Sequence, residues 1–174
     1  GTASGTITIS TGTYNTSSGS YALYNTTTAT RNSGFGGCAL FSNTTASYNV
    51  AVGHASLRSN TTASNNTSVG ACSLYANTTG ACNTAIGYKA LLANTTACSN
   101  VAVGVEALQS NTTGDGNTAT GKGALQANTT GVSNDAFGRS ALYANTTGTK
   151  NVSIGRNSLS SNTPGTQNVA SGYY

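Results

Sequence analysis

Large apolar side chains recur in this chain at a constant spacing of 17 residues, separated by polar and small residues. One series consists of leucines, and a second series, five residues before the leucines, consists of valine, isoleucine or phenylalanine. Disordered chains lack apolar residues in a fixed phase, so the pattern indicates a structural repeat. The leucines are Leu23, Leu40, Leu57, Leu74, Leu91, Leu108, Leu125, Leu142 and Leu159. The second series includes Val52, Val69, Ile86, Val103, Phe137 and Ile154.

Asparagine and glycine keep the same 17-residue spacing. We number the repeat from this asparagine, which places the glycine at position 5 and the leucine at position 9. The period is too short for the common two-helix repeats, which need more than about 30 residues. The asparagines are Asn15, Asn32, Asn49, Asn66, Asn83, Asn100, Asn117, Asn134, Asn151 and Asn168. The glycines are Gly19, Gly36, Gly53, Gly70, Gly87, Gly104, Gly121, Gly138, Gly155 and Gly172.

Each repeat predicts two short strands. One is Asn-Val-Ala-Val, ended by Gly, and the other is Ala-Leu-x-Ser-Asn-Thr, ended by Thr-Gly, because both runs are short and contain β-branched residues. We therefore predict an all-β fold, a parallel β-solenoid or β-roll of about ten 17-residue coils with two strands per coil. Ten coils at about 4.8 Å each would form a rod about 50 Å long.

The fixed residues suit the corners and interior of such a coil. We expect Leu at position 9 to stack into a narrow core and Gly at position 5 to take a positive φ at a corner. Asn at positions 1 and 12 is expected to stack in side-chain amide ladders that satisfy backbone groups of the turns. A coil of this size encloses little volume, so we expect one apolar face to pack on another copy.

The chain divides into residues 1–14, an N-terminal strand, and residues 15–174, the solenoid. The strand is indicated by the alternating run from Thr6 to Ser10. In the first repeat, residues 15–24 read as one residue short and residues 25–31 as carrying one extra residue. The two shifts cancel, so the asparagines and glycines stay in phase.

Charge is too sparse for a nucleic-acid partner. Only 6% of the residues are charged and the net charge is +4, whereas phosphate-binding surfaces need clustered Lys and Arg. Lys122, Arg139 and Arg156 share position 6, and we interpret them as solvated side chains. No stretch approaches 18 apolar residues, so we expect no membrane span. Since the sequence starts at Gly1 rather than Met, we expect the processed form of a secreted protein.

Several repeats resemble a known family. Asn-Thr-Ala-Ile-Gly at 83–87, Asn-Val-Ala-Val-Gly at 49–53 and 100–104, and Asn-Val-Ser-Ile-Gly at 151–155 look like the head repeats of trimeric autotransporter adhesins. The resemblance implies a left-handed parallel β-roll built as a trimer, in a surface-exposed, fibrous, adhesive protein. Similar tandem repeats occur in phage fibres and in secreted extracellular fibrils.

The two ends of the sequence suggest polymerisation. Residues 168–174 occupy positions 1–7 of a coil, and residues 5–14 occupy positions 8–17. We expect the start of one subunit to complete the last coil of its neighbour, which gives an open head-to-tail interface and a filament. The residues that we assign to this junction are Thr6, Ile7, Thr8, Ile9, Asn168, Val169, Ala170 and Tyr173.

Asn-Thr-Thr occurs eight times and is an N-glycosylation sequon each time. We favour the threonines as O-linked acceptors, because a stacked Asn amide is not free to react; the alternative is a turn without sugar. The threonine candidates are Thr26, Thr27, Thr44, Thr45, Thr61, Thr62, Thr78, Thr79, Thr95, Thr96, Thr112, Thr113, Thr129, Thr130, Thr146 and Thr147. The asparagine candidates are Asn25, Asn43, Asn60, Asn77, Asn94, Asn111, Asn128 and Asn145.

The four cysteines suit an oxidising location. Cys82 and Cys98 fall at positions 17 and 16 of adjacent coils, so we predict that they lie within disulfide reach. Cys38 and Cys72 share position 7 two coils apart, about 10 Å, which is too far for a bridge within one subunit. Their spacing is not that of metal ligands.

We expect no catalysis, no metal and no cofactor. Glu106, Asp115 and Asp135 are the acids and His54 is the one histidine, and their repeat positions offer no acid–base pair. The sequence is best interpreted as the subunit of an extracellular or cell-surface, glycosylated fibril that binds copies of itself. The alternative is a trimeric adhesin or phage tail-fibre module that binds host glycans. An ice-binding protein is a third class, but its outward Thr-x-Thr pairs are absent from the repeat consensus.

Overall fold

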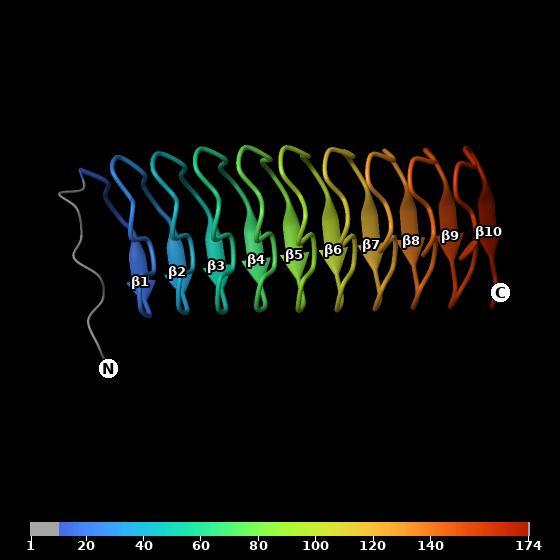
Figure 1. Cartoon of the computed structure of the whole chain (residues 1–174), viewed down its shortest axis with the longest axis horizontal. Helices are drawn as coiled ribbons and strands as arrows, with labels where there is room; N and C mark the ends of the chain where they lie inside the picture. The colour runs from blue at the N-terminus through green and yellow to red at the C-terminus, as the bar shows by residue number, and fades with distance from the viewer. Residues whose placement is uncertain (1–10, 174) are drawn as a thin grey trace.

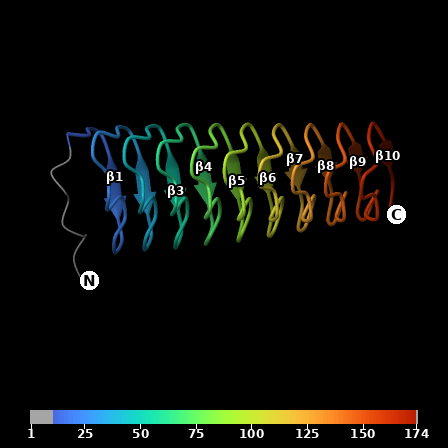
Figure 2. The ribbon, with the colours of Figure 1, turned by 45° about the horizontal axis from the view of Figure 1, so that its top comes forward.

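The computed structural model of this chain describes residues 11–173, which wind into coils along a single axis (Figures 1 and 2). Their ten strands form one parallel sheet whose strand order follows the sequence. Successive strands are 17 residues apart, so Val52 pairs with Val69 and Val69 with Ile86. The predicted parallel β-solenoid is therefore confirmed. The strands are β1 (Thr16–Ser18), β2 (Ser33–Phe35), β3 (Val50–Val52), β4 (Thr67–Val69), β5 (Thr84–Ile86), β6 (Val101–Val103), β7 (Thr118–Thr120), β8 (Asp135–Phe137), β9 (Val152–Ile154) and β10 (Val169–Ser171).

Within the described residues each coil contains one strand, so the prediction of two strands per coil is wrong. The Ala-Leu-x-Ser-Asn-Thr segment forms turns instead, because the backbone is left-handed just before it at position 7 and within it at position 9, as at Lys89 (φ 57°) and Leu91 (φ 52°). The turns still bond to the next coil, since Leu91 N–H donates to the Ala107 carbonyl at 3.0 Å. Both walls of the solenoid are therefore hydrogen-bonded from coil to coil, but only one has strand geometry.

Leucines stacked one per coil form the apolar centre. Leu91 and Leu108 are fully buried and belong to one continuous cluster of leucines and alanines. Burial of one such side chain contributes about 2 kcal/mol, which offsets the cost of roughly 1–2 kcal/mol for placing it in a left-handed conformation. Small residues at positions 3 and 8, which are Ala or Ser except for Gly34, complete the interior, and Ala85 and Ala90 are also fully buried.

The glycine at position 5 turns the chain at the end of each strand. Gly104 has φ +138°, and a Cβ on it would lie 2.6 Å from the carbonyl oxygen of Gly121 in the next coil. A side chain there meets both an unfavourable backbone conformation and the neighbouring coil. The predicted positive φ at this corner is confirmed.

Two asparagine ladders occupy the remaining interior, as predicted. Asn83 N–H, at position 1, donates to Asn66 Oδ1 at 2.9 Å, and Asn94 Nδ2, at position 12, donates to Asn77 Oδ1 at 2.8 Å. The ladders meet at position 15, where the Ala97 carbonyl accepts from both Asn83 Nδ2 (2.8 Å) and Asn94 Nδ2 (3.0 Å). These amides satisfy buried backbone groups that turns would otherwise leave unpaired.

The first coil keeps the register of all the others, so the interpretation of compensating shifts is wrong. Asn25 N–H donates to the Phe41 carbonyl, as Ser42 N–H donates to the Arg58 carbonyl one coil later. Asn25 thus occupies position 11, and Thr26 occupies the ladder position 12. Thr26 is 5% exposed and its hydroxyl has no hydrogen-bond partner.

Candidate functional site

Exposed threonines form a line along one edge of the solenoid, and we call this line the outer Thr row. They occupy position 14 in eight successive coils, and all of them are exposed; the ninth coil has Pro164 at this position. The preceding threonine at position 13 is engaged, since Thr78 Oγ1 donates to the Thr95 carbonyl at 3.1 Å. Position 13 thus supports the coil stack, and position 14 presents its hydroxyl to solvent. The row consists of Thr28, Thr45, Thr62, Thr79, Thr96, Thr113, Thr130 and Thr147.

The asparagines of seven Asn-Thr-Thr sequons are buried in the position-12 ladder, without any exposed surface. Asn94 shows their environment, because its side-chain nitrogen donates to two oxygens and its side-chain oxygen accepts from Asn111 at 3.2 Å. A glycan on that nitrogen has no room in the folded coil. The buried asparagines are Asn43, Asn60, Asn77, Asn94, Asn111, Asn128 and Asn145.

Register decides which residues of the first coil reach the surface. Asn25, at position 11, lies outside the buried ladder, and Thr28 rather than Thr27 joins the outer Thr row. Sequence reasoning missed Thr28 because it aligned the first Asn-Thr-Thr with the later ones. It also missed Asn65, which begins the sequon Asn65-Asn66-Thr67 and is exposed at a left-handed corner with φ 62°.

All four cysteines are free thiols in this structure. Cys82 and Cys98, the candidates for a disulfide, are not bridged in it. Cys82 is exposed, whereas the Cys98 sulfur accepts the Ala81 N–H at 3.4 Å and donates to the carbonyl of Thr96.

The last coil exposes a hydrogen-bonding edge on β10. At each inner junction the position-2 N–H donates to the next coil's position-1 carbonyl, as Val152 N–H does to Asn168 at 2.8 Å. Val169 is the equivalent donor of the last coil and is 79% exposed. A hollow of about 420 Å³ beside this edge is lined by Leu159, Ala170, Asn157, Ser160, Ser161 and Asn162.

The opposite edge presents the complementary groups on the two residues that flank β1. At each inner junction the position-1 N–H donates to the Asn Oδ1 of the preceding coil, as Asn168 N–H does to Asn151 Oδ1 at 3.0 Å. The position-5 N–H donates to the position-4 carbonyl of the preceding coil. Asn15 and Gly19 are the equivalent donors of the first coil. Thr13 already belongs to the coil stack, because its carbonyl accepts Arg31 N–H at 3.1 Å. The predicted junction residues Thr6, Ile7, Thr8 and Ile9 lie outside the described residues.

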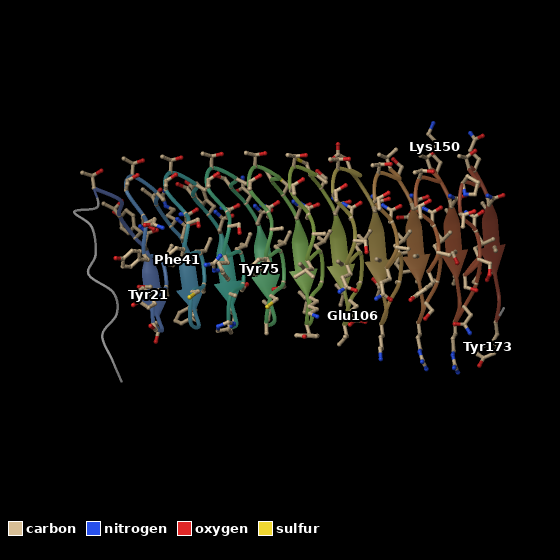
Figure 3. The ribbon with its side chains drawn as sticks, in the orientation of Figure 1. Tyr21, Phe41, Tyr75, Glu106, Lys150 and Tyr173 are labelled. Carbon is tan, nitrogen blue, oxygen red and sulfur yellow. The ribbon has the colours of Figure 1, made fainter. Side chains whose placement is uncertain are left out.

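Aromatic and basic side chains alternate along the walls. Arg58 lies between the rings of Phe41 (5.3 Å) and Tyr75 (5.6 Å), and Phe41 and Tyr75 are labelled in Figure 3. At the C-terminal end Arg156 covers the Tyr173 ring at 5.4 Å. Each such contact contributes about 0.5–1 kcal/mol at an exposed site. These rows stabilise neighbouring coils, and they use the ring faces that a flat ligand would need.

The acidic residues occupy separate positions of the coil. Glu106 accepts the Gln126 amide at 3.4 Å, and Asp115 accepts the Cys98 N–H at 2.6 Å. Across residues 11–173, His, Cys, Asp and Glu form no group of three that could hold a metal ion. The same residues include no helix with the length and apolarity of a membrane crossing.

No family model, curated protein or solved structure matches this chain. The surfaces available for function are therefore judged by their own chemistry. They are the outer Thr row, the two coil edges and the solvent side of the sheet.

Proposed function

We propose that this chain is the structural subunit of an extracellular fibril, in which copies stack head to tail and carry sugars on the outer Thr row. The observation that carries the proposal is the match between the edge groups of β10 and those of β1. Every junction inside the solenoid is made by the same groups, so a second copy continues the stack in the same register. Such an interface is heterologous and does not close, which produces filaments.

Three hydrogen bonds of the inner junctions would be repeated between copies. Asn168 Oδ1 would accept the Asn15 N–H of the next copy, and Val169 N–H would donate to its Asn15 carbonyl. The Ser171 carbonyl would accept its Gly19 N–H. Equivalent inner bonds measure 2.7–3.0 Å. At about 1 kcal/mol net each, they contribute about 3 kcal/mol, and burial of Leu159 in the hollow adds to this.

The sugar part of the proposal rests on the exposed hydroxyls of the outer Thr row. One hydroxyl in each of eight successive coils, at a spacing of about 4.8 Å, would give a dense line of attached sugars on one edge. Glycans are large and solubilising, and they would keep this edge free of other protein contacts. An extracellular or cell-surface location is part of the proposal, because sugars of this kind are carried by secreted and surface proteins. The glycans would also solubilise a surface on which only 6% of the residues are charged.

Val169→Pro tests polymerisation. It removes the N–H that points to the next copy and places a ring against the incoming coil, while the folded subunit uses neither. The expected result is an unchanged circular dichroism spectrum with no filaments by negative-stain electron microscopy. Val169→Ala keeps the N–H and is expected to polymerise normally. Filaments of normal length from the proline variant would refute head-to-tail stacking, and compact three-fold particles would favour the trimeric adhesin.

Intact mass of protein from its natural source tests the sugar coat. A glycosylated chain is expected to exceed the polypeptide mass of 17.2 kDa by sums of sugar residues, with fragments placing them on the outer Thr row. A mass equal to that of the polypeptide would exclude the sugar coat and leave the filament proposal intact.

A further inference from the structure

The solvent side of the sheet carries at least one large apolar side chain in every strand except β1 and β7, which have only Thr and Ser there. In each strand position 3 points inward and positions 2 and 4 point outward, so Ala85 is fully buried while Ile86 is 40% exposed. We call the residues at positions 2 and 4 the outer sheet face. Asp135 is the charged residue among them. Its exposed large apolar residues are Phe35, Val50, Val52, Ile86, Val101, Phe137, Ile154 and Val169.

We propose that the outer sheet face is a lateral interface with a second copy of this chain, which pairs two head-to-tail filaments face to face. The inference rests on the proposed filament. The face presents the same two positions in every coil at a spacing of about 4.8 Å, and a partner can follow it along its whole length only if it repeats at the same spacing. A second copy has that spacing by construction, and two such faces pack about 10 Å apart as in other stacked sheets.

The area of the face explains why pairing belongs to the filament. Ten strands at about 4.8 Å and three residues at about 3.3 Å give a strip of about 480 Å². Stable interfaces need about 800 Å² on each partner, so two isolated subunits would pair weakly. In a filament each added subunit extends the same strip, and the contacts accumulate along the axis.

The charges favour an antiparallel pair. If the two solenoids ran parallel in register, Lys150 at position 17 would face Arg139 of the other copy at position 6, twice in each pair. In the antiparallel arrangement the eighth coil, which contains β8, faces the third coil, which contains β3. Arg139 then lies opposite His54, and Asp135 lies opposite Val50. The two Asp135 carboxylates are then about five coils, or about 24 Å, apart, beyond the screening length at physiological salt. Like charges are therefore separated.

Ile86→Lys tests the pairing by placing a charge at the centre of the outer sheet face. Tyr143→Lys is the matched control, since Tyr143 lies on another wall and is 44% exposed. We expect wild-type and Tyr143→Lys filaments to be two solenoids wide in electron micrographs, and Ile86→Lys filaments to be long but one solenoid wide. Ile86→Thr, which keeps a β-branched residue in the strand, covers the case in which the lysine variant fails to fold.

The outcomes separate lateral pairing from head-to-tail stacking. Wild-type filaments of single width would overturn the pairing and leave the filament in place. Filaments of three solenoids, or paired Ile86→Lys filaments, would also overturn it. If no variant forms filaments, sedimentation equilibrium of concentrated protein decides. A dimer that Ile86→Lys weakens at least tenfold supports the interface, and a monomer refutes it.

Discussion

Thr26→Asn is expected to stabilise the first coil, because it extends the position-12 asparagine ladder by one member. Thr26 now places a buried hydroxyl without a partner at this position. Asn60, a regular member of the ladder, donates to Asn43 Oδ1 at 3.1 Å and to the Ala63 carbonyl at 2.9 Å. Asn43 donates to the Ala46 carbonyl at 3.0 Å and has no ladder oxygen before it.

The size of the effect follows from the bonds that are gained. The new amide would donate to the Ala29 carbonyl, and its oxygen would accept from Asn43 Nδ2. Two bonds at about 1 kcal/mol each predict a gain of about 2 kcal/mol in unfolding free energy. For a chain of this size that corresponds to a rise of roughly 4–8 °C in the melting temperature.

The assay is thermal and urea unfolding followed by circular dichroism, in the Val169→Pro background so that single subunits are compared. Thr28→Asn is the matched control, because position 14 is exposed and offers no ladder partner. Hydrogen exchange should show slower exchange in the first coil of the Thr26→Asn variant only. An unchanged or lower stability of Thr26→Asn, or an equal gain in the control, would refute the ladder as a source of stability.

Three further substitutions test the interior. Gly104→Ala should lower the free energy of unfolding by about 3 kcal/mol or more, since its Cβ meets the next coil at a positive φ. Gly123→Ala, at φ +65°, should lower it by about 1 kcal/mol, and urea unfolding compares the two variants. Asn94→Ala should lower the free energy of unfolding by about 2–4 kcal/mol, because the ladder bonds are lost. Thr96→Ala, at an exposed position, should change it almost not at all in the same measurement. Leu91→Ala should cost about 2–5 kcal/mol by opening a cavity in a core one leucine wide, and equal melting temperatures would contradict that core.

Spacing alone was enough to predict the coil. A residue type that returns every 17 positions must return to the same place on each turn if like is to stack on like, and Leu91 and Leu108 do so. Gly at position 5 was equally readable, because a corner that repeats in every coil needs the residue without a Cβ. The amide ladders followed from Asn at two fixed positions.

Backbone conformation at positions 7 and 9 was not readable in the same way. Leucine disfavours a left-handed conformation, so local propensity predicted a second strand where the structure has turns. The conformation is adopted because it places Leu91 in the core while its N–H still reaches Ala107 of the next coil. That compensation comes from a neighbour 16 residues away and is invisible in any short segment.

Thr26 and Thr28 show the same difference between what spacing determines and what the tertiary structure determines. The amino-acid sequence alone established the period, the fold class and the identity of the stacked residues, because these depend on spacing. Which member of a polar cluster faces inward was decided by tertiary structure, through hydrogen bonds between coils that hold the first turn in register with the second. Exposure of the second threonine in each pair, and of the outer sheet face, has the same origin, since a side chain's direction depends on the backbone to which its coil is bonded.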